Sequence, residues 1–210
     1  EWFGLATAEM LDLNRGLFVT RDGNRTLQPR PDSMQIAGAD HLSYFALLGR
    51  IAGLALYHRE PLNASWATFF LKAAFGYTIE SDDLESVDPT LHRSQSKLLD
   101  MSAEELDSCD LSFVVDHSDE AIVYAEGATK RRRATELKPG GEDEAVTPEN
   151  VREYLKLFAT HKLIGAIQEQ VTAFRAGLGV FFEPSLLAKL RACCTVADVQ
   201  LLLCGAATID

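Results

Sequence analysis

The sequence of 210 residues has little of what marks several classes of protein. Its four cysteines include the adjacent pair Cys193 and Cys194, which is unsuited to a disulfide framework at this length and favours a reducing compartment. Proline and glycine together number 21, which excludes collagen-like and low-complexity chains. No apolar run reaches the roughly 18 residues of a transmembrane helix. The composition therefore predicts a globular domain without a membrane span.

Motifs for metals and cofactors are also missing. The five histidines show no i, i+4 pairing, and no two cysteines have the spacing of a zinc site. No glycine-rich loop with Lys-Ser/Thr is present to hold phosphates. Ser94–Lys97 matches S-x-x-K, but the companion motifs of that enzyme class are absent. We therefore expect neither a metal nor a cofactor.

Basic residues are scarce as well. The net charge is −11, and residues 79–126 hold 14 acidic and 2 basic residues, a local net charge of −12. Nucleic-acid binding needs clustered Lys and Arg, so a general nucleic-acid role is excluded and a basic protein partner is favoured. The one basic run, residues 130–133, fits nuclear import, a phosphate-binding patch, a solvated loop or local charge balance.

What the sequence does have is a large apolar share, 47% of all residues, with mainly helical spacing. A hairpin is predicted for residues 17–20 and 26–27, which lie on either side of the turn pair Asp22-Gly23. A loop is predicted for residues 29–38. Strands are expected at 111–115, 121–124 and 135–137. Helices are expected at 1–13, 40–58 capped by Asp40, from Asn63 to Gly76, from Asp88, after Ser102, at 147–176, from Pro184, and at 196–204.

This pattern predicts a mostly helical α+β fold in two parts. The segment of residues 79–160, which contains the acidic stretch, is predicted to be a small α+β subdomain. It is inserted into a helical subdomain formed by residues 1–78 and 161–210. Gly49 and Gly53, four apart on one helix face, predict close packing of two helices. Leu91, Leu98 and Met101 follow i, i+7, i+10 spacing, and either pack the insert on itself or line an apolar groove rimmed by acids.

The cysteines offer one enzymatic alternative. Cys193 and Cys194 lie near Lys189 and Arg191, which could lower a thiol pKa, but packing roles are favoured. Cys204 ends the apolar run 201–203 and reads as a buried small hydrophobe. The chain begins at Glu1-Trp2 rather than at Met, which predicts a piece of a larger protein.

Several segments resemble the amino-terminal lobe of HECT ubiquitin ligases, in order along the whole chain. They are Glu1-Trp2-Phe3, residues 41–45, 49–55 and 83–89, Glu136–Gly141, Cys204-Gly205 and residues 207–210. The resemblance implies an enzyme that accepts ubiquitin on a cysteine as a thioester and passes it to a substrate lysine. It also implies that this cysteine lies in a separate carboxy-terminal lobe, so that no residue of this chain is catalytic and the chain alone is inactive.

In the family this lobe docks a ubiquitin-conjugating enzyme through the small subdomain, here residues 79–160. Carried over position by position, the groove falls on Leu91, Ser94, Gln95, Leu98, Met101, Cys109, Leu111, Arg152, Tyr154 and Phe158. Gln95 stands where family members often have an apolar residue. Some members bind a second ubiquitin through an aromatic before Gly-Leu-Phe, but here Asn14 and Arg15 precede Gly16, so the resemblance does not extend to that site.

The implied partners are a conjugating enzyme, ubiquitin, and protein substrates chosen by regions outside this chain. The expected compartment is the cytoplasm, or the nucleus if the basic run serves import. The alternative from another class is a non-catalytic interaction module with a ligase-like lobe.

Overall fold

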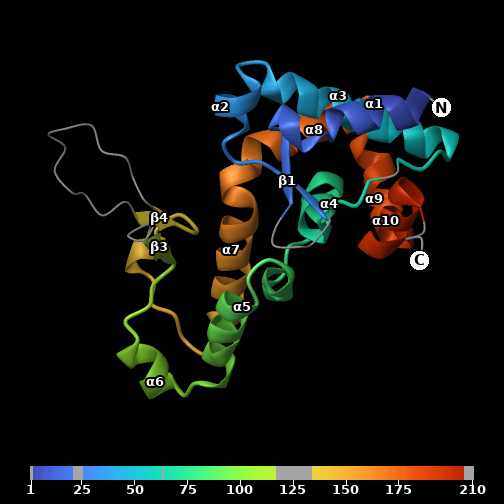
Figure 1. The fold of residues 1–210 in the computed structure, drawn as a ribbon. Helices are drawn as coiled ribbons and strands as arrows, with labels where there is room; N and C mark the ends of the chain where they lie inside the picture. The colour runs from blue at the N-terminus through green and yellow to red at the C-terminus, as the bar shows by residue number, and fades with distance from the viewer. Residues whose placement is uncertain (1, 21–25, 63, 117–133, 206–210) are drawn as a thin grey trace, which may run out of the picture. The chain divides into compact units, whose positions relative to one another are not determined.

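The computed structural model describes residues 2–20, 26–62, 64–116 and 134–205 (Figure 1). It divides into two compact units, one formed by residues 1–79 and 163–210 and the other by residues 80–162. The fold is mostly helical α+β, as the sequence predicted, with a small two-stranded antiparallel sheet in each unit. Within the described residues no helix is both long and apolar enough to cross a bilayer.

The first unit is built mainly of helices. Its elements are α1 (Trp2–Met10), η1 (Leu13–Arg15), β1 (Phe18–Thr20), β2 (Leu27–Pro29), α2 (Ser33–Ala37), α3 (His41–His58), α4 (Thr68–Phe75), η5 (Gly165–Ile167), α8 (Gln168–Leu178), α9 (Pro184–Cys193) and α10 (Val196–Cys204). The predicted hairpin is confirmed: β1 pairs antiparallel with β2, Val19 opposite Gln28, while its turn lies outside the described residues.

Aromatic side chains form the core of the first unit. Phe18 of β1, Phe45 of α3, Phe70 of α4 and Phe174 of α8 are all at most 1% exposed, and Trp66 is fully buried. Their rings meet at centroid distances of 5.2–6.3 Å, mostly edge to face, which is the favoured arrangement for aromatic pairs. Residues from both ends of the chain therefore share one core.

The pairing of α3 with α8 depends on glycine. An added Cβ at Gly49 would overlap the carbonyl oxygen of Phe174, and one at Gly177 would overlap that of Ala46. The close helix packing predicted from Gly49 is therefore confirmed. Gly53 instead lies against the ring of Phe181. A Cβ added to Gly53 would stand 2.9 Å from the nearest ring carbon of Phe181.

The second unit combines short helices with one small sheet. Its elements are η2 (Ser81–Ser86), α5 (Pro89–Ser96), η3 (Lys97–Asp100), α6 (Ala103–Ser108), β3 (Val114–Asp116), β4 (Ala134–Glu136), η4 (Gly141–Asp143) and α7 (Val151–Ile164), whose last two residues belong to the first unit. β3 pairs antiparallel with β4, Val115 opposite Thr135. The predicted strand 121–124 and the basic run 130–133 lie outside the described residues.

Several expectations were wrong in detail. The loop 29–38 contains strand residue Pro29 and the one-turn helix α2. Asp40 precedes α3, but its side chain makes no cap hydrogen bond. The helix expected after Asn63 begins only at Thr68, because Trp66 first makes a bridge to Leu27 in extended backbone. The helix expected to run from 147 to 176 begins at Val151 and breaks at residues 165–167 into α7 and α8.

Candidate docking site

The first half of the predicted site lies on α5, whose start is fixed by its sequence. The carboxylate of Asp88 accepts a hydrogen bond from the Leu91 backbone N–H at 2.8 Å, and Pro89 occupies the first turn, where its missing N–H costs nothing. His92 Nε2 lies 3.5 Å from Asp82 Oδ1 of η2. Of these contacts, the one between His92 and Asp82 joins α5 to the preceding 3₁₀ helix.

Leu91 and Gln95 are half-buried and lie four residues apart, on one face of α5. Ser94 is exposed, and its hydroxyl donates to the Leu91 carbonyl at 3.2 Å. The single helix expected from Leu91 to Met101 was wrong. α5 ends at Ser96, so that Leu98 (8% exposed) lies in η3 and the half-buried Met101 follows it.

The second half of the predicted site lies on α7 and is aromatic. Tyr154 and Phe158 are 4% and 7% exposed, and their ring centroids are 5.9 Å apart. The Tyr154 ring also meets Phe113 edge to face at 5.6 Å. Burial raises the pKa of the Tyr154 phenol above its usual value. The two aromatic residues therefore belong to the core of the second unit and show the surface only a narrow edge.

The remaining predicted residues are more scattered. Leu111 is half-buried, and its carbonyl accepts from the Val146 N–H at 2.9 Å. Arg152 is exposed and lies two residues from Tyr154, hence on the opposite side of α7. Cys109 is exposed at the end of α6. The structure thus brings Tyr154 and Phe158 into contact, whereas Arg152 does not share their helix face.

Two supporting residues, Phe113 and Lys138, escaped the sequence reasoning. Lys138 Nζ lies 3.8 Å from the centroid of the fully buried Phe113 ring and binds Glu144 at 2.7 Å and Glu153 at 3.0 Å. The hydrogen bond to Glu144 raises the pKa of Lys138. This contact ties the loop after β4 to α7. Two features of the sequence could have indicated this contact. Phe113 lies in the middle of the apolar run 111–115, and Lys138 directly precedes the turn Pro139-Gly140-Gly141.

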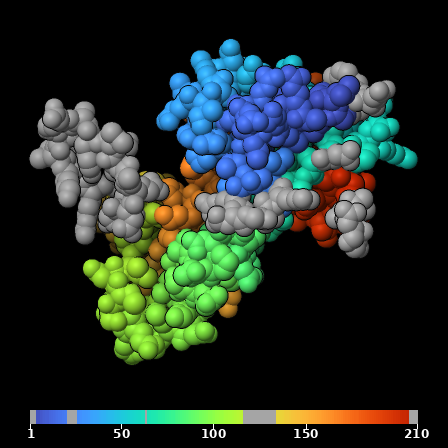
Figure 2. Space-filling view, viewed as in Figure 1, coloured from blue at the N-terminus to red at the C-terminus, as the bar shows by residue number. Residues whose placement is uncertain are grey.

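Exposed carboxylates mark the neighbouring surface. Figure 2 shows α5 and α6 as adjoining green areas on one face of the molecule. On α6, Glu104, Glu105 and Asp107 are all exposed. Glu104 and Asp107 join Glu149 around a pocket of about 420 Å³ with Val146 among its lining residues, none of which is basic. The second unit therefore presents a surface complementary to cations.

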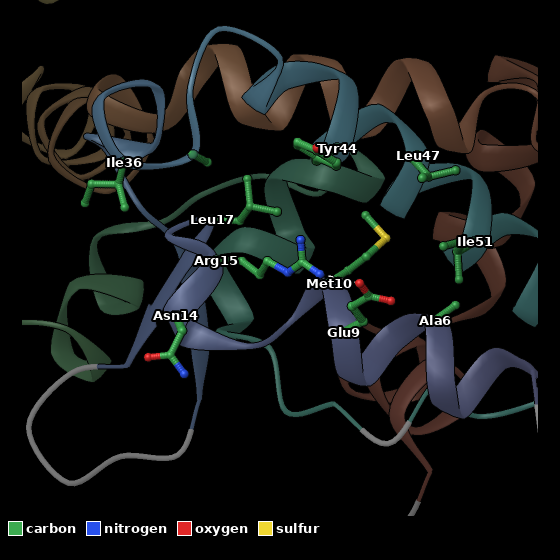
Figure 3. Close-up of a pocket in the computed structure, with 11 residues that line it drawn as sticks. Ala6, Glu9, Met10, Asn14, Arg15, Leu17, Ile36, Tyr44, Leu47 and Ile51 are labelled. Atoms are coloured by element: carbon green, nitrogen blue, oxygen red, sulfur yellow. Dashed lines mark hydrogen bonds and ion pairs between the residues drawn. The ribbon is translucent and has the colours of Figure 1, made fainter.

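A separate pocket of about 520 Å³ belongs to the first unit (Figure 3). Tyr44, Leu47 and Ile51 of α3 line one side, and α1 lines the other. Arg15 reaches across toward α1 and pairs with Glu9. The pocket is mainly apolar with one ion pair. Its sequence signal was a stripe of apolar residues on α3, at positions 44, 47 and 51.

A buried polar network lies elsewhere in the first unit. Ser33 Oγ is 2.9 Å from His41 Nδ1 and accepts a hydrogen bond from Gln170 Nε2 at 3.1 Å. Gln170 Nε2 also donates to the Arg30 carbonyl at 3.1 Å. Because Ser33 is fully buried and His41 and Gln170 are 4% and 3% exposed, a substrate cannot reach the hydroxyl. The network holds α2, α3 and α8 together.

The four cysteines are all unpaired. Cys109 and Cys193 are exposed, whereas Cys194 and Cys204 are half-buried. Burial raises the pKa of the Cys204 thiol, which disfavours the reactive thiolate. In the ranges the structure describes, no three His, Cys, Asp or Glu side chains are grouped so that they could hold a metal ion.

Comparisons with known proteins agree along the whole chain. A family model described as "HECT-domain (ubiquitin-transferase)" matches residues 4–210. The E3 ubiquitin-protein ligase HACE1 of Xenopus laevis is 34% identical over 210 residues, which is all of this chain and 21% of that protein. Smurf1 of Drosophila melanogaster is 35% identical and NEDD4 of Rattus norvegicus 36%, again over all of this chain and over 18% and 22% of those proteins.

The chain thus spans about a fifth of the length of these curated relatives. Both kinds of match cover residues from each of the two units. The chain belongs to the HECT-domain family of ubiquitin transferases.

Proposed function

We propose that this chain recruits a ubiquitin-conjugating enzyme within a HECT ubiquitin ligase. The observation that carries the proposal is the match of the HECT family model to residues 4–210. The named relatives, all E3 ubiquitin-protein ligases, support it. The first unit serves as scaffold, and the small subdomain of residues 79–160 carries the docking surface.

The proposed docking surface combines the half-buried face of α5 with the narrow exposed edge of two core aromatic residues. Leu91, Gln95 and Met101 offer apolar and amide surface, while the rings of Tyr154 and Phe158 lie 5.9 Å apart. Rigid aromatic side chains in a well-packed setting are the usual anchors of an interface. The remaining docking residues are Ser94, Leu98, Leu111 and Arg152.

The chemistry lies outside this chain. The thiolate of a cysteine in a carboxy-terminal lobe attacks the thioester carbon between ubiquitin and the conjugating enzyme, forming a new thioester and releasing the enzyme's thiol. A substrate lysine amine then attacks that thioester, forms an amide and releases the ligase cysteine. No cofactor enters either step. None of Cys109, Cys193, Cys194 or Cys204 takes part, so the isolated chain forms no ubiquitin thioester.

The acidic surface speeds the encounter. Glu104, Glu105 and Asp107 are exposed on α6, in a segment of strongly negative local charge. Opposite charge on the partner raises association rates, and salt screens this steering over about 10 Å at 0.1 M. Association therefore slows as salt rises, while dissociation changes little. A salt-independent association rate contradicts this role.

The central experiment is a titration of the purified chain with a panel of conjugating enzymes. Tyr154→Ala weakens binding by about 30-fold, a loss typical of an anchor residue. Because Tyr154 is also a core residue, its replacement could weaken binding by unfolding the unit, so Leu91→Ala is the second variant. Leu99→Ala is the matched control, since Leu99 is 40% exposed. No saturable binding, or equal effects at Leu91 and Leu99, contradicts the proposal.

The full-length protein decides between a ligase and an interaction module. A ligase acquires a ubiquitin adduct that reducing agent removes, whereas a module binds the conjugating enzyme without forming one. Substrates are chosen by regions outside this chain. We place the protein in the cytoplasm, or in the nucleus if the basic run 130–133 serves import, which imaging of the tagged full-length protein tests.

A further inference from the structure

A polar pocket of about 370 Å³ lies in the first unit, beside the buried network of Ser33, His41 and Gln170. His41 and Gln170 line it, together with residues of α2, of η5 and of the first turn of α8. Both side chains are more than nine-tenths buried, so neither belongs to the general surface. The docking surface proposed above belongs to the second unit and uses no residue of this pocket.

The orientation of the Gln170 amide is fixed by its partners. Its Nε2 atom donates to the carbonyls of Arg30 at 3.1 Å and Pro31 at 3.4 Å, and a carbonyl can only accept. The amide oxygen, Oε1, therefore points away from these carbonyls, and it has no donor in the described parts of the chain. In those parts the fully enclosed unpaired side-chain atoms are Trp66 Nε1 and Gln95 Oε1. Oε1 of Gln170 is not enclosed in this way, so it is open to the pocket that its residue lines.

The hydrogen-bond network also assigns the proton of His41. Ser33 Oγ accepts from Gln170 Nε2 at 3.1 Å, and His41 Nδ1, at 2.9 Å, is the acceptor for the hydroxyl hydrogen of Ser33. A neutral imidazole that accepts at Nδ1 carries its proton at Nε2. This N–H has no partner among the described residues, and it is not one of the enclosed atoms. It therefore donates into the pocket.

A carboxylate completes the set of free groups. Glu169 is exposed and lines the pocket, and in the described parts of the chain it makes no ion pair. Asp32 also lines the pocket, but its Oδ1 is paired with Arg30 Nε at 2.8 Å. None of the lining residues is lysine or arginine. The pocket thus offers one donor, His41 Nε2, and two acceptors, Gln170 Oε1 and the Glu169 carboxylate.

We propose that this pocket binds a primary carboxamide, the side-chain group of asparagine or glutamine in a protein partner. A carboxamide has one acceptor oxygen and two N–H donors, which match the one donor and two acceptors of the pocket. A carboxylate has no N–H to donate and is repelled by Glu169. A guanidinium has no acceptor for the N–H of His41. The volume of about 370 Å³ falls within the range of ligand pockets, about 300–1,000 Å³.

The test is an NMR titration of the ¹⁵N-labelled intact chain with three blocked amino acids. N-acetylglutamine methylamide is the probe, and its glutamate and arginine counterparts are the comparisons. A ligand of this size binds with a Kd of about 1 mM, which a titration resolves. The glutamine probe should shift the backbone amides of α2, η5 and the first turn of α8, and bind at least about tenfold more tightly than the other two. Equal or tighter binding of either comparison, or saturation by none of the three, overturns the proposal.

Two variants and one spectrum test the assigned groups. His41→Asn keeps a side-chain amide near the position of Nδ1 but removes the Nε2 donor, and Glu169→Ala removes the carboxylate without touching the buried network. Each should weaken binding of the glutamine probe about tenfold, whereas Glu60→Ala, at an exposed residue that does not line the pocket, should not. The ¹⁵N spectrum of the wild-type imidazole should show the Nε2–H form of His41. The other tautomer, or unchanged affinity in Glu169→Ala, overturns the assignment even if His41→Asn fails to fold.

Discussion

Gly49 and Gly177 make reciprocal contacts across the α3–α8 crossing. Gly49 lies against the backbone of α8 at Phe174, and Gly177 lies against the backbone of α3 at Ala46. Backbone atoms of two helices can approach this closely only where a side chain is absent. The pair brings Phe45 and Phe174 into one aromatic core with Phe18, Trp66 and Phe70.

Alanine at either glycine should destabilise the first unit. The new Cβ of Gly177→Ala would overlap the Ala46 carbonyl, so the helices must separate, and overpacking of this kind costs about 1–3 kcal/mol. Thermal unfolding followed by circular dichroism measures the effect. Gly4→Ala in α1 is the control, since no atom lies within 4 Å of the added Cβ and helix propensity favours alanine by up to about 1 kcal/mol. Equal midpoints for the two variants would contradict the close crossing.

The capping role of Asp88 predicts a graded series. Asp88→Ala removes the acceptor for the Leu91 N–H and should cost about 1 kcal/mol, with weaker binding of the conjugating enzyme because the start of α5 frays. Asp88→Asn keeps an acceptor of equal capping strength and should behave like wild type in both measurements. Chemical denaturation and titration with the same enzyme report the two effects. Loss of binding in the asparagine variant would assign Asp88 a charge role instead.

The raised pKa of Tyr154 predicts a loss of stability in alkali. Its folded-state pKa lies above the ordinary value of 10.0, so between these two values the native state binds more protons than the unfolded state. The free energy of unfolding therefore falls as pH rises above about 10. Tyr154→Phe should flatten this fall, whereas Tyr57→Phe, at a residue 73% exposed, should not. Urea unfolding at several alkaline pH values checks the slope.

Thiol exposure predicts an order of alkylation. Cys109 and Cys193 are exposed and should react with iodoacetamide first, whereas Cys204 should react last because burial raises the pKa of its thiol. Mass spectrometry of the labelled peptides over time gives the four rates, which should converge in denaturant. Faster alkylation of Cys193 or Cys194 than of Cys109 would support the alternative that the protein is a thiol enzyme that uses this pair.

The sequence was most informative at helix ends. Thr195 and Asp198 form the capping box that starts α10, and Ser102 and Glu105 form the one that starts α6, so both starts were predictable. These signals are local hydrogen bonds between residues three apart. The break at Gly165 was not predictable, because the apolar spacing continues through it and a single glycine is a weak helix breaker.

The candidate site was predicted less completely than the helices. Helical spacing placed Tyr154 and Phe158 on one face of α7, but the Tyr154 ring also packs against Phe113, which directly precedes β3 about 40 residues earlier in the chain. The contact of Lys138 with Phe113 likewise depends on tertiary packing. The orphan carbonyl of Gln95 has no sequence signal, since it reflects which donors fail to reach it in the folded chain.

The division of the chain also bears on how it is synthesised. α3 ends at His58, and its glycine-lined partner α8 begins only at Gln168. With ribosomes adding 5–20 residues per second, the apolar face of α3 waits on the order of ten seconds for α8 to emerge. Residues 80–162 are made within that interval and have their own core, so they can fold first. Chaperone demand should therefore fall on the first helices of the nascent chain, not on the acidic insert.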